Sequence, residues 1–187
     1  MKFLKFLLIL FISINSPIKA DSNQNLINEL KNGGKLIFIR HAYAPGGGDP
    51  NNFDITDCNT QRNLSNSGRE QARNIGVFFK DNNIKIDNIY SSEWCRCKET
   101  AVIAFNKFEN KKFLNSFFSV KFTNNKDLQI KNLKKFIKDW DGDKNLIFVT
   151  HYVVISELLN YSSGSGEIVI SDKNYNIIGN FPISLNE

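Results

Sequence analysis

The sequence has few residues of the kinds that bind metal ions. It contains two histidines, His41 and His151, and three cysteines among 187 residues. Cys95 and Cys97 form a close pair, but the chain has no second such pair, and neither histidine lies at ligand spacing from this one. Structural zinc sites take four Cys or His ligands at short spacings. This scarcity argues against a metal centre, and we expect no metal and no other cofactor.

The apolar run near the N-terminus is too short to span a bilayer comfortably. It covers residues 6–14, follows two lysines and leads to Ala20, a pattern typical of a cleaved secretory signal peptide. A membrane-spanning helix needs about 20 apolar residues, and no cysteine follows Ala20 to carry a lipid. We therefore predict a signal peptide at residues 1–20 and one domain at 21–187, with no stable membrane anchor after cleavage. A retained anchor helix is the alternative.

The chain shows little excess of either charge once this leader is removed. Its 24 Lys and Arg and 19 Asp and Glu give a net charge of +5. Residues 1–20 hold three of the lysines and no acid, so their removal leaves 21 basic against 19 acidic residues, about +2. Nucleic-acid binders carry a basic stripe or patch, and the sequence shows none. We expect a periplasmic or secreted protein without a nucleic-acid partner.

Export also determines how the three cysteines are interpreted. Disulfides form in secreted and periplasmic proteins, and an odd count leaves one cysteine over. Cys95 and Cys97 are too close in sequence to favour pairing with each other, whereas Cys58 lies in a distant loop that can fold back. We predict a Cys58–Cys95 disulfide with Cys97 free.

Apolar strands alternate with amphipathic helices along the chain. Ser65 is placed to cap a helix in which apolar residues recur at helical spacing. A loop rich in Gly, Pro, Asn and Asp covers residues 42–63 and is expected to shape any pocket. The predicted strands are 35–40, 86–92, 117–122 and 145–150, with a final antiparallel hairpin of 166–171 and 175–180; the predicted helices are 26–32, 65–83, 94–105, 128–140 and 153–159.

This alternation predicts the fold class. Uniformly apolar strands are typical of a mostly parallel sheet with helices on both faces, so we expect a three-layer α/β fold. Ligands bind such folds outside the carboxyl ends of the strands. If "LIFIR" and "LIFVT" are neighbouring parallel strands, His41 and His151 lie side by side at that edge. The strand "IDNIY" delivers Ser92 and Arg96 to the same edge.

The residues gathered there suit phosphoryl chemistry. Arginines such as Arg40 and Arg96 bind phosphate oxygens bidentately. A neutral histidine nitrogen is a nucleophile, and an ordinary pKa of about 6.5 leaves enough of that form. One histidine after a strand is commonly structural, but two at equivalent strand ends, one directly after an arginine, favour catalysis.

Four segments, in order, resemble the motifs of the histidine phosphatase superfamily, also called phosphoglycerate mutase-like. They are "RHA" at 40–42, "RNLSNSGREQA" at 62–72, "YSSEWCRCKETA" at 90–101 and "VTHYVVI" at 149–155. The "DC" before the second motif is most similar to a small exported bacterial branch. The resemblance implies a phosphoglycerate mutase-like fold.

The resemblance also implies roles for individual residues. It makes His41 the nucleophile that forms a phosphohistidine, with Arg40, Arg96 and His151 around the phosphoryl group. Pre-placed cations at the equatorial oxygens lower the barrier to transfer. Arg62 either reaches the phosphate or is a solvated surface arginine.

Two positions depart from the family pattern. Ala42 replaces the usual glycine, and Tyr152 replaces the aspartate that follows the second histidine in one branch. The general acid is therefore open. Glu167, at the start of a strand that can approach the site, is the first candidate, and Glu93 and Asp57 are the next.

The expected function is that of an exported histidine acid-type phosphatase, a phosphoric monoester hydrolase that acts on a small phosphorylated substrate. An envelope glycan phosphate, a lipid head-group phosphate and a scavenged nutrient ester all fit export. The alternative is a phosphate-ester binding protein of the envelope that retains the pocket without turnover. A purely structural envelope protein gives no reason for pairing arginines with both histidines.

Overall fold

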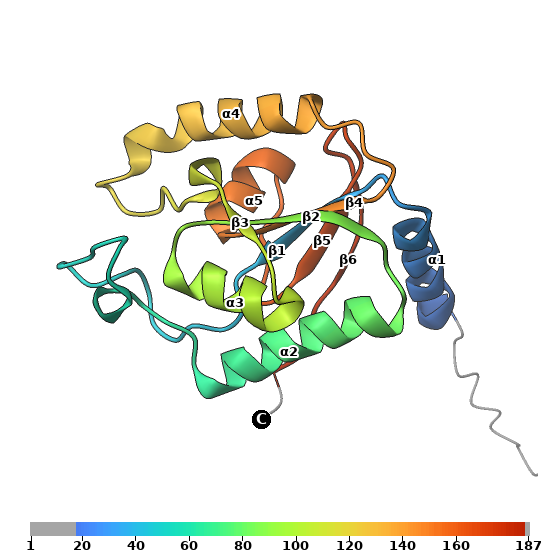
Figure 1. Ribbon diagram of the computed structural model, residues 1–187, viewed down its shortest axis with the longest axis horizontal. Coiled ribbons are helices and arrows are strands. Elements are labelled where there is room, and N and C mark those ends of the chain that lie inside the picture. Colours follow the sequence, from blue (N-terminus) through green and yellow to red (C-terminus); the bar gives the residue numbers. More distant parts are fainter. Residues whose placement is uncertain (1–17, 186–187) are drawn as a thin grey trace, which may run out of the picture.

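A computed structural model describes residues 18–185, with side chains from residue 23 onward (Figure 1). The predicted signal peptide lies outside these residues except for 18–20, which belong to the first helix, so it stays a prediction. The helices are α1 Ile18–Asn32, α2 Asn66–Asp81, α3 Cys95–Phe105, α4 Lys126–Lys138 and α5 Tyr152–Leu159, with short 3-10 turns at Cys58–Thr60, Lys112–Leu114 and Thr123–Asn125. The strands are β1 Leu36–Arg40, β2 Ile86–Ser91, β3 Glu109–Asn110, β4 Asn145–Thr150, β5 Ile168–Ser171 and β6 Ile177–Phe181. No helix among these residues is long and apolar enough to cross a membrane.

The strands form one six-stranded sheet in the order β3-β2-β4-β1-β5-β6. The four strands β3, β2, β4 and β1 run parallel, and β5 and β6 form an antiparallel hairpin that joins β1. The register pairs Phe38 with Phe148 and Arg40 with Thr150, so β1 and β4 end at the same level. The mostly parallel sheet is confirmed.

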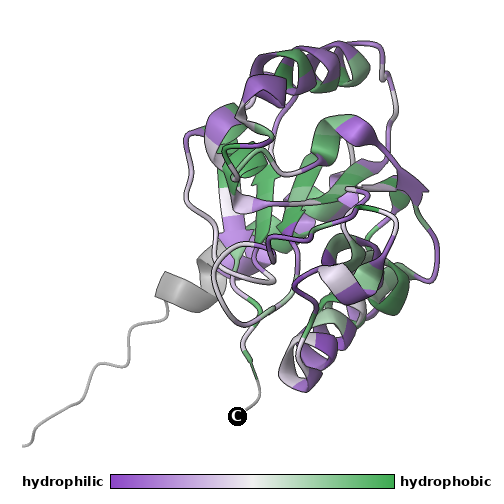
Figure 2. Cartoon of the chain, turned by 90° about the vertical axis from the view of Figure 1, so that its left-hand side faces the viewer, coloured by the Kyte–Doolittle hydropathy of each residue, from purple (hydrophilic) through white to green (hydrophobic). Residues whose placement is uncertain are grey.

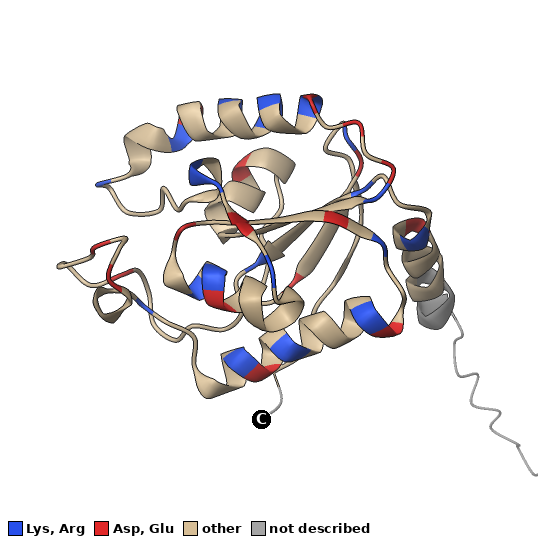
Figure 3. Ribbon diagram, viewed as in Figure 1, with Lys and Arg blue, Asp and Glu red and all other residues tan. Residues whose placement is uncertain are grey.

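Helices cover both faces of this sheet (Figure 1). Along β1, Ile37 and Ile39 point into a core with α1, α2 and α3, while Leu36 and Phe38 point into a second core with α4 and α5. Successive side chains of a strand alternate between faces, and here both faces are apolar. Figure 2 shows the hydrophobic sheet between helices whose outer surfaces are hydrophilic. The basic residues of α4 lie on its outer surface (Figure 3). This confirms the three-layer architecture.

The helix boundaries follow from local chemistry. The hydroxyl of Ser65 accepts a hydrogen bond from the backbone N–H of Gly68, which caps α2 as predicted. After α1 the chain turns at Gly33 and Gly34, both with positive φ, and enters β1. Such angles suit glycine because it has no Cβ.

The disulfide joins the long loop to the start of α3. Cys58 and Cys95 are bonded, with their Cα atoms 5.7 Å apart, and Cys97 is a buried free cysteine, as predicted. Since Arg96 follows Cys95 directly, the bond ties loop 42–63 to the helix turn that carries this arginine.

The strand predicted at 117–122 is wrong. The segment contains turns, in which the N–H of Phe122 donates to the carbonyl of Ser119 at 2.8 Å. The ring of Phe122 packs against Trp94 at a centroid distance of 5.6 Å, while Val120 is 91 % exposed. Phe122 therefore packs over the loop, against Phe53 and Trp94, while Phe117 is buried in the core shared with α4 and α5. The short strand β3 takes the edge position instead.

Candidate active site

The two histidines lie side by side where β1 and β4 end. His41 follows β1, His151 follows β4, and their ring centroids are 5.5 Å apart at an interplanar angle of 67°. The N–H of His41 donates to the carbonyl of Thr150 at 2.9 Å, which continues the pairing of the strands by one residue. The juxtaposition predicted from the two similar strands is confirmed.

His41 is held with one nitrogen unprotonated. Its Nδ1 lies 2.8 Å from the carbonyl oxygen of Ala42. A carbonyl oxygen only accepts, so Nδ1 carries the proton and Nε2 of the neutral ring keeps its lone pair. Nε–H of Arg96 donates to this Nε2 at 3.2 Å. Burial, followed by the charge of Arg96, holds the pKa of His41 well below its ordinary value. The ring is therefore neutral at physiological pH, and Nε2 keeps the lone pair that a nucleophilic nitrogen needs.

His151 is equally buried and also lines the cavity. Its Nε2 lies 3.0 Å from the hydroxyl of Ser92 and 3.5 Å from the sulfur of Cys97. Trp94 packs edge-on against its ring at 5.3 Å. Burial, and then Arg96 and His41, lower its pKa well below the ordinary value. Both imidazoles are thus available as neutral groups.

Three arginines from three different segments surround the histidines. Arg40 ends β1, Arg62 lies near the end of the long loop, and Arg96 lies in the first turn of α3. Nη1 of Arg40 donates to the carbonyl of Ser163 at 2.7 Å, and the guanidinium lies 5.3 Å from the ring centroid of Tyr152. Burial is the first cause of a lowered pKa in both Arg40 and Arg62. Such partly desolvated cations have a strong attraction for a dianion.

Two backbone carbonyls and the loop conformation hold Arg62. Its Nε donates to the carbonyl of Gly48 at 3.0 Å, and its Nη1 donates to the carbonyl of Ala44. Gly46 and Gly48 have positive φ, which lets the loop curl around the guanidinium. Arg62 is half-buried, so the structure favours a place in the site over a solvated surface position.

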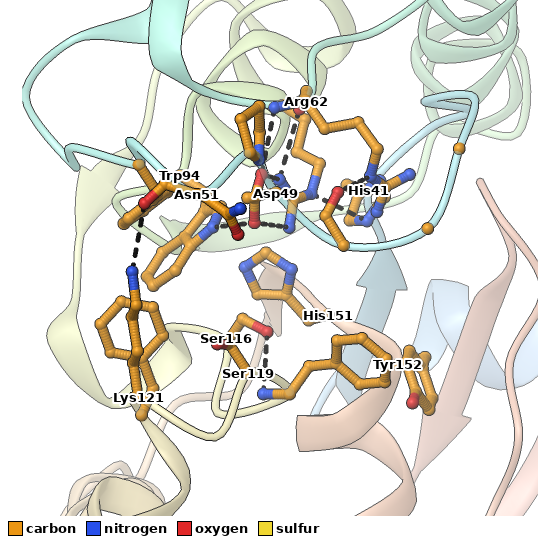
Figure 4. A pocket seen from close by; sticks show the side chains of 18 of the residues that line it. His41, Asp49, Asn51, Arg62, Trp94, Ser116, Ser119, Lys121, His151 and Tyr152 are labelled. Atoms are coloured by element: carbon orange, nitrogen blue, oxygen red, sulfur yellow. Dashed lines mark hydrogen bonds and ion pairs between the residues drawn. The ribbon is translucent and has the colours of Figure 1, made fainter.

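These groups line a cavity of about 200 Å³, shown in Figure 4. Its polar lining includes both histidines, the three arginines and Lys121, and Asp49 is the one acidic residue in the lining that the described part of the chain provides. With neutral histidines the lining is therefore cationic. The aromatic lining residues are Phe53, Trp94, Phe118, Phe122 and Tyr152. A cavity lined by cations and aromatic rings suits a phosphoryl group that carries an organic substituent.

The candidate acids do not line this cavity. Glu167 is buried beside it, where its carboxylate accepts the hydroxyl of Tyr161 and the N–H of Gly164, each at 2.6 Å. Glu93 accepts from the side-chain amide of Asn115 at 2.7 Å. Asp57 is exposed and caps a short 3-10 turn. A role for Glu167 as the proton donor stays a prediction, and it requires the carboxylate to leave both partners.

Sequence reasoning missed Asp49, whose carboxylate is ion-paired with Arg96 at 2.7 Å. The loop sequence "GGGDP" offers no periodicity that marks this residue.

Among residues 18–185, no group of three or more His, Cys, Asp or Glu residues is placed to hold a metal ion.

Comparison with known proteins agrees with this geometry. The family model "Histidine phosphatase superfamily (branch 1)" matches residues 36–114. The mitochondrial serine/threonine-protein phosphatase Pgam5 of Drosophila willistoni is 32 % identical over 82 residues, which are 44 % of this chain and 25 % of that protein. The match therefore spans a quarter of the length of this curated relative.

Solved structures show the same fold at low sequence identity. Phosphoglycerate mutase from Thermus thermophilus is 12 % identical with a TM-score of 0.56, over 80 % of this chain and 99 % of that one. The protein histidine phosphatase SixA, solved with tungstate, is 15 % identical with a TM-score of 0.55, over 78 % and 95 %. The fold is that of the phosphoglycerate mutase and SixA histidine phosphatases. The segment that the histidine phosphatase superfamily model matches contains His41, Arg62 and Arg96.

Proposed function

We propose that this protein is a phosphomonoesterase that works through a phosphohistidine on His41. One observation carries the proposal: the unprotonated Nε2 of His41 lies 3.2 Å from Nε of Arg96 in a cationic cavity. The site thus pairs a nucleophile with a donor aimed at the place where a transferred phosphoryl group arrives. The tungstate complex of SixA supports the proposal, because tungstate is an oxyanion like phosphate.

In the first step the lone pair of Nε2 attacks phosphorus. A P–N bond forms, the bond from phosphorus to the ester oxygen breaks, and that oxygen leaves with the electron pair and takes a proton from solvent. Nδ1–H stays bonded to the carbonyl of Ala42, which stabilises the positive charge that develops on the ring. The guanidinium groups of Arg40, Arg62 and Arg96 stabilise the charge on the equatorial oxygens.

In the second step water attacks the phosphohistidine. A P–O bond forms to the water oxygen, the P–N bond breaks with its electron pair returning to Nε2, and inorganic phosphate leaves after the water has given up a proton to solvent. His41 returns to its neutral form, which the surrounding arginines and burial favour. Splitting the reaction in two lets one site serve both steps.

A second candidate function is phosphate-ester binding without turnover. The observation that favours it is the position of Glu167 outside the cavity lining, with its carboxylate already hydrogen-bonded. A site without a proton donor releases alkoxides slowly, although it still releases phenolates, which need little protonation. An aryl ester therefore tests the nucleophile independently of the acid.

We infer export and an envelope or nutrient phosphomonoester as substrate. The leader-like residues 1–20 and the Cys58–Cys95 disulfide support this inference. Cell fractionation and N-terminal sequencing test it: the expected protein begins at Asp21 outside the cytoplasm. A full-length protein in the cytoplasm would contradict it.

Hydrolysis of nitrophenyl phosphate by wild type and His41→Ala tests the catalytic function. We expect turnover by wild type and a loss of at least about 1,000-fold in His41→Ala, as for other catalytic nucleophiles. Equal activity in both proteins would overturn the proposal. If neither protein turns over, tight binding of inorganic phosphate by wild type would favour the binding function instead.

A further inference from the structure

Arg96 uses the two edges of its guanidinium for different partners. The end-on edge, which Nη1 and Nη2 form, faces Asp49. Nη1 lies 2.7 Å from Oδ1, and Nη2 lies 3.2 Å from Oδ2. Its Nε–H faces Nε2 of His41 at 3.2 Å, and Nη1 also reaches the carbonyl of Arg62 at 3.3 Å. In a guanidinium, Nε–H and one N–H of Nη2 point the same way and form the side-on edge. That edge is the one turned toward His41.

Asp49 is itself held in place by groups other than Arg96. Its Oδ2 accepts the indole N–H of Trp94 at 3.0 Å, and its Oδ1 accepts the backbone N–H of Arg62 at 3.0 Å. The side chain is 17 % exposed, and that of Arg96 is 3 % exposed. The ion pair is therefore largely removed from water. A bidentate pair in such a place fixes the orientation of the guanidinium well.

The carboxylate is ionised and can only accept. Burial raises the pKa of Asp49, but the hydrogen bond and charge of Arg96, with the bonds from Trp94 and Arg62, outweigh burial and lower it overall. Asp49 is therefore not placed to protonate a leaving group. All of its hydrogen bonds serve to hold donors in place.

We propose that Asp49 is a positioning residue that holds Arg96 by its end-on edge, so that the side-on edge receives the phosphoryl group transferred to Nε2 of His41. The proposal rests on the function proposed above. A phosphoryl group on Nε2 meets Nε–H and Nη2–H together, a bidentate match to two phosphate oxygens. The opposite idea is that Asp49 blocks the site and must be displaced by substrate. It predicts tighter phosphate binding and faster turnover when the carboxylate is removed.

The test compares Asp49→Asn with Asp54→Asn. Asp54 lies on the same loop and is exposed, and among the described residues its carboxylate accepts hydrogen bonds from Thr56 alone. With nitrophenyl phosphate we expect Asp49→Asn to lower kcat about 10- to 100-fold, the effect typical of residues that orient a functional group through hydrogen bonds, with a smaller change in KM. We expect Asp54→Asn to stay within about twofold of wild type. Equal kcat for the two variants, or a rise in Asp49→Asn, would overturn the proposal.

A double-mutant cycle shows whether Asp49 acts through Arg96. If it does, Asp49→Asn has little further effect in an Arg96→Lys background, because lysine has no edges to orient. If the fold losses of kcat from the two single substitutions multiply in the double variant, the proposal is contradicted. Thermal unfolding of each variant shows whether a loss of kcat comes from loss of the fold. If Asp49→Asn does not fold, Asp49→Ser provides a smaller replacement.

The NMR signal of the Arg96 Nε–H gives a result that does not require turnover. We expect a resolved, slowly exchanging signal in wild type that broadens or is lost in Asp49→Asn and persists in Asp54→Asn. If the three proteins show this pattern of signals but wild type does not hydrolyse the ester, the proposed function fails while the positioning role stands. An unchanged signal in Asp49→Asn would overturn the positioning role even in an active enzyme.

Discussion

Arg96 donates a hydrogen bond from Nε to Nε2 of His41, the nitrogen that keeps its lone pair. This contact exists only while Nε2 is unprotonated, since a protonated nitrogen has no lone pair to accept with. The arginine thus favours the neutral form of the ring, the form in which Nε2 attacks phosphorus in the proposed mechanism.

Replacing Arg96 by lysine removes the planar fork while keeping the charge. Lysine cannot bind a carboxylate and a phosphoryl group through two ordered edges. We expect kcat/KM for an aryl phosphate to fall about 100- to 1,000-fold, as when one preorganised donor to a transition state is lost. The control is Arg69→Lys, because Arg69 pairs with Glu99 away from the cavity, and we expect it to stay near wild type. Similar activities for the two variants would contradict the role of Arg96.

The buried neutral histidines predict that stability falls in mild acid. The pKa values of His41 and His151 are lowered in the folded state, so below about pH 6.5 the unfolded chain binds more protons than the folded one. The free energy of unfolding therefore rises with pH in this window and falls as pH drops below about 6.5, by at most about 1.4 kcal/mol per pH unit for each histidine.

Denaturant unfolding between pH 7.5 and pH 5 measures this effect. The double variant His41→Gln/His151→Gln is the comparison, and we expect its stability to change less over the same range. An equally steep loss in the double variant would mean that other groups cause the pH dependence.

The disulfide is expected to support both stability and activity. It closes a loop with a sequence separation of 37 residues, for which chain entropy predicts about 4 kcal/mol of stabilisation at most. Cys58→Ala/Cys95→Ala should therefore unfold at lower denaturant. We also expect lower kcat, because the bond ties loop 42–63, with Asp49 and Arg62, to the residue before Arg96. Treatment of wild type with reductant should reproduce both losses, and unchanged kcat in the double variant would contradict the link to the site.

Much of the fold could be predicted because the sequence pattern is regular where the sheet is buried. The two apolar strands before His41 and His151 are parallel neighbours in register, and this alone brings the histidines together. The segment 117–122 has a similar apolar pattern but no strand, because Phe122 packs on Trp94 and the chain turns at Ser119. Whether an apolar segment forms a strand at the edge of the sheet depends on tertiary contacts, which the local sequence pattern does not contain.

The site was predictable only where it follows strand ends or a family motif. Asp49 reaches Arg96 across 47 positions of sequence, and its place depends on the path of an irregular loop. Glu167 precedes a strand that approaches the site, but its side chain turns to Tyr161 and Gly164 instead of the cavity. Side-chain direction at a strand entrance depends on such local hydrogen bonds.

The most direct test of the phosphohistidine mechanism is to trap the phosphorylated enzyme. Wild type mixed with an aryl phosphate and quenched rapidly in base should contain an acid-labile, base-stable phosphate that peptide mapping places on His41, and His41→Ala should contain none. Phosphate on another residue, or hydrolysis by wild type without any phosphorylated protein, would contradict the phosphohistidine mechanism.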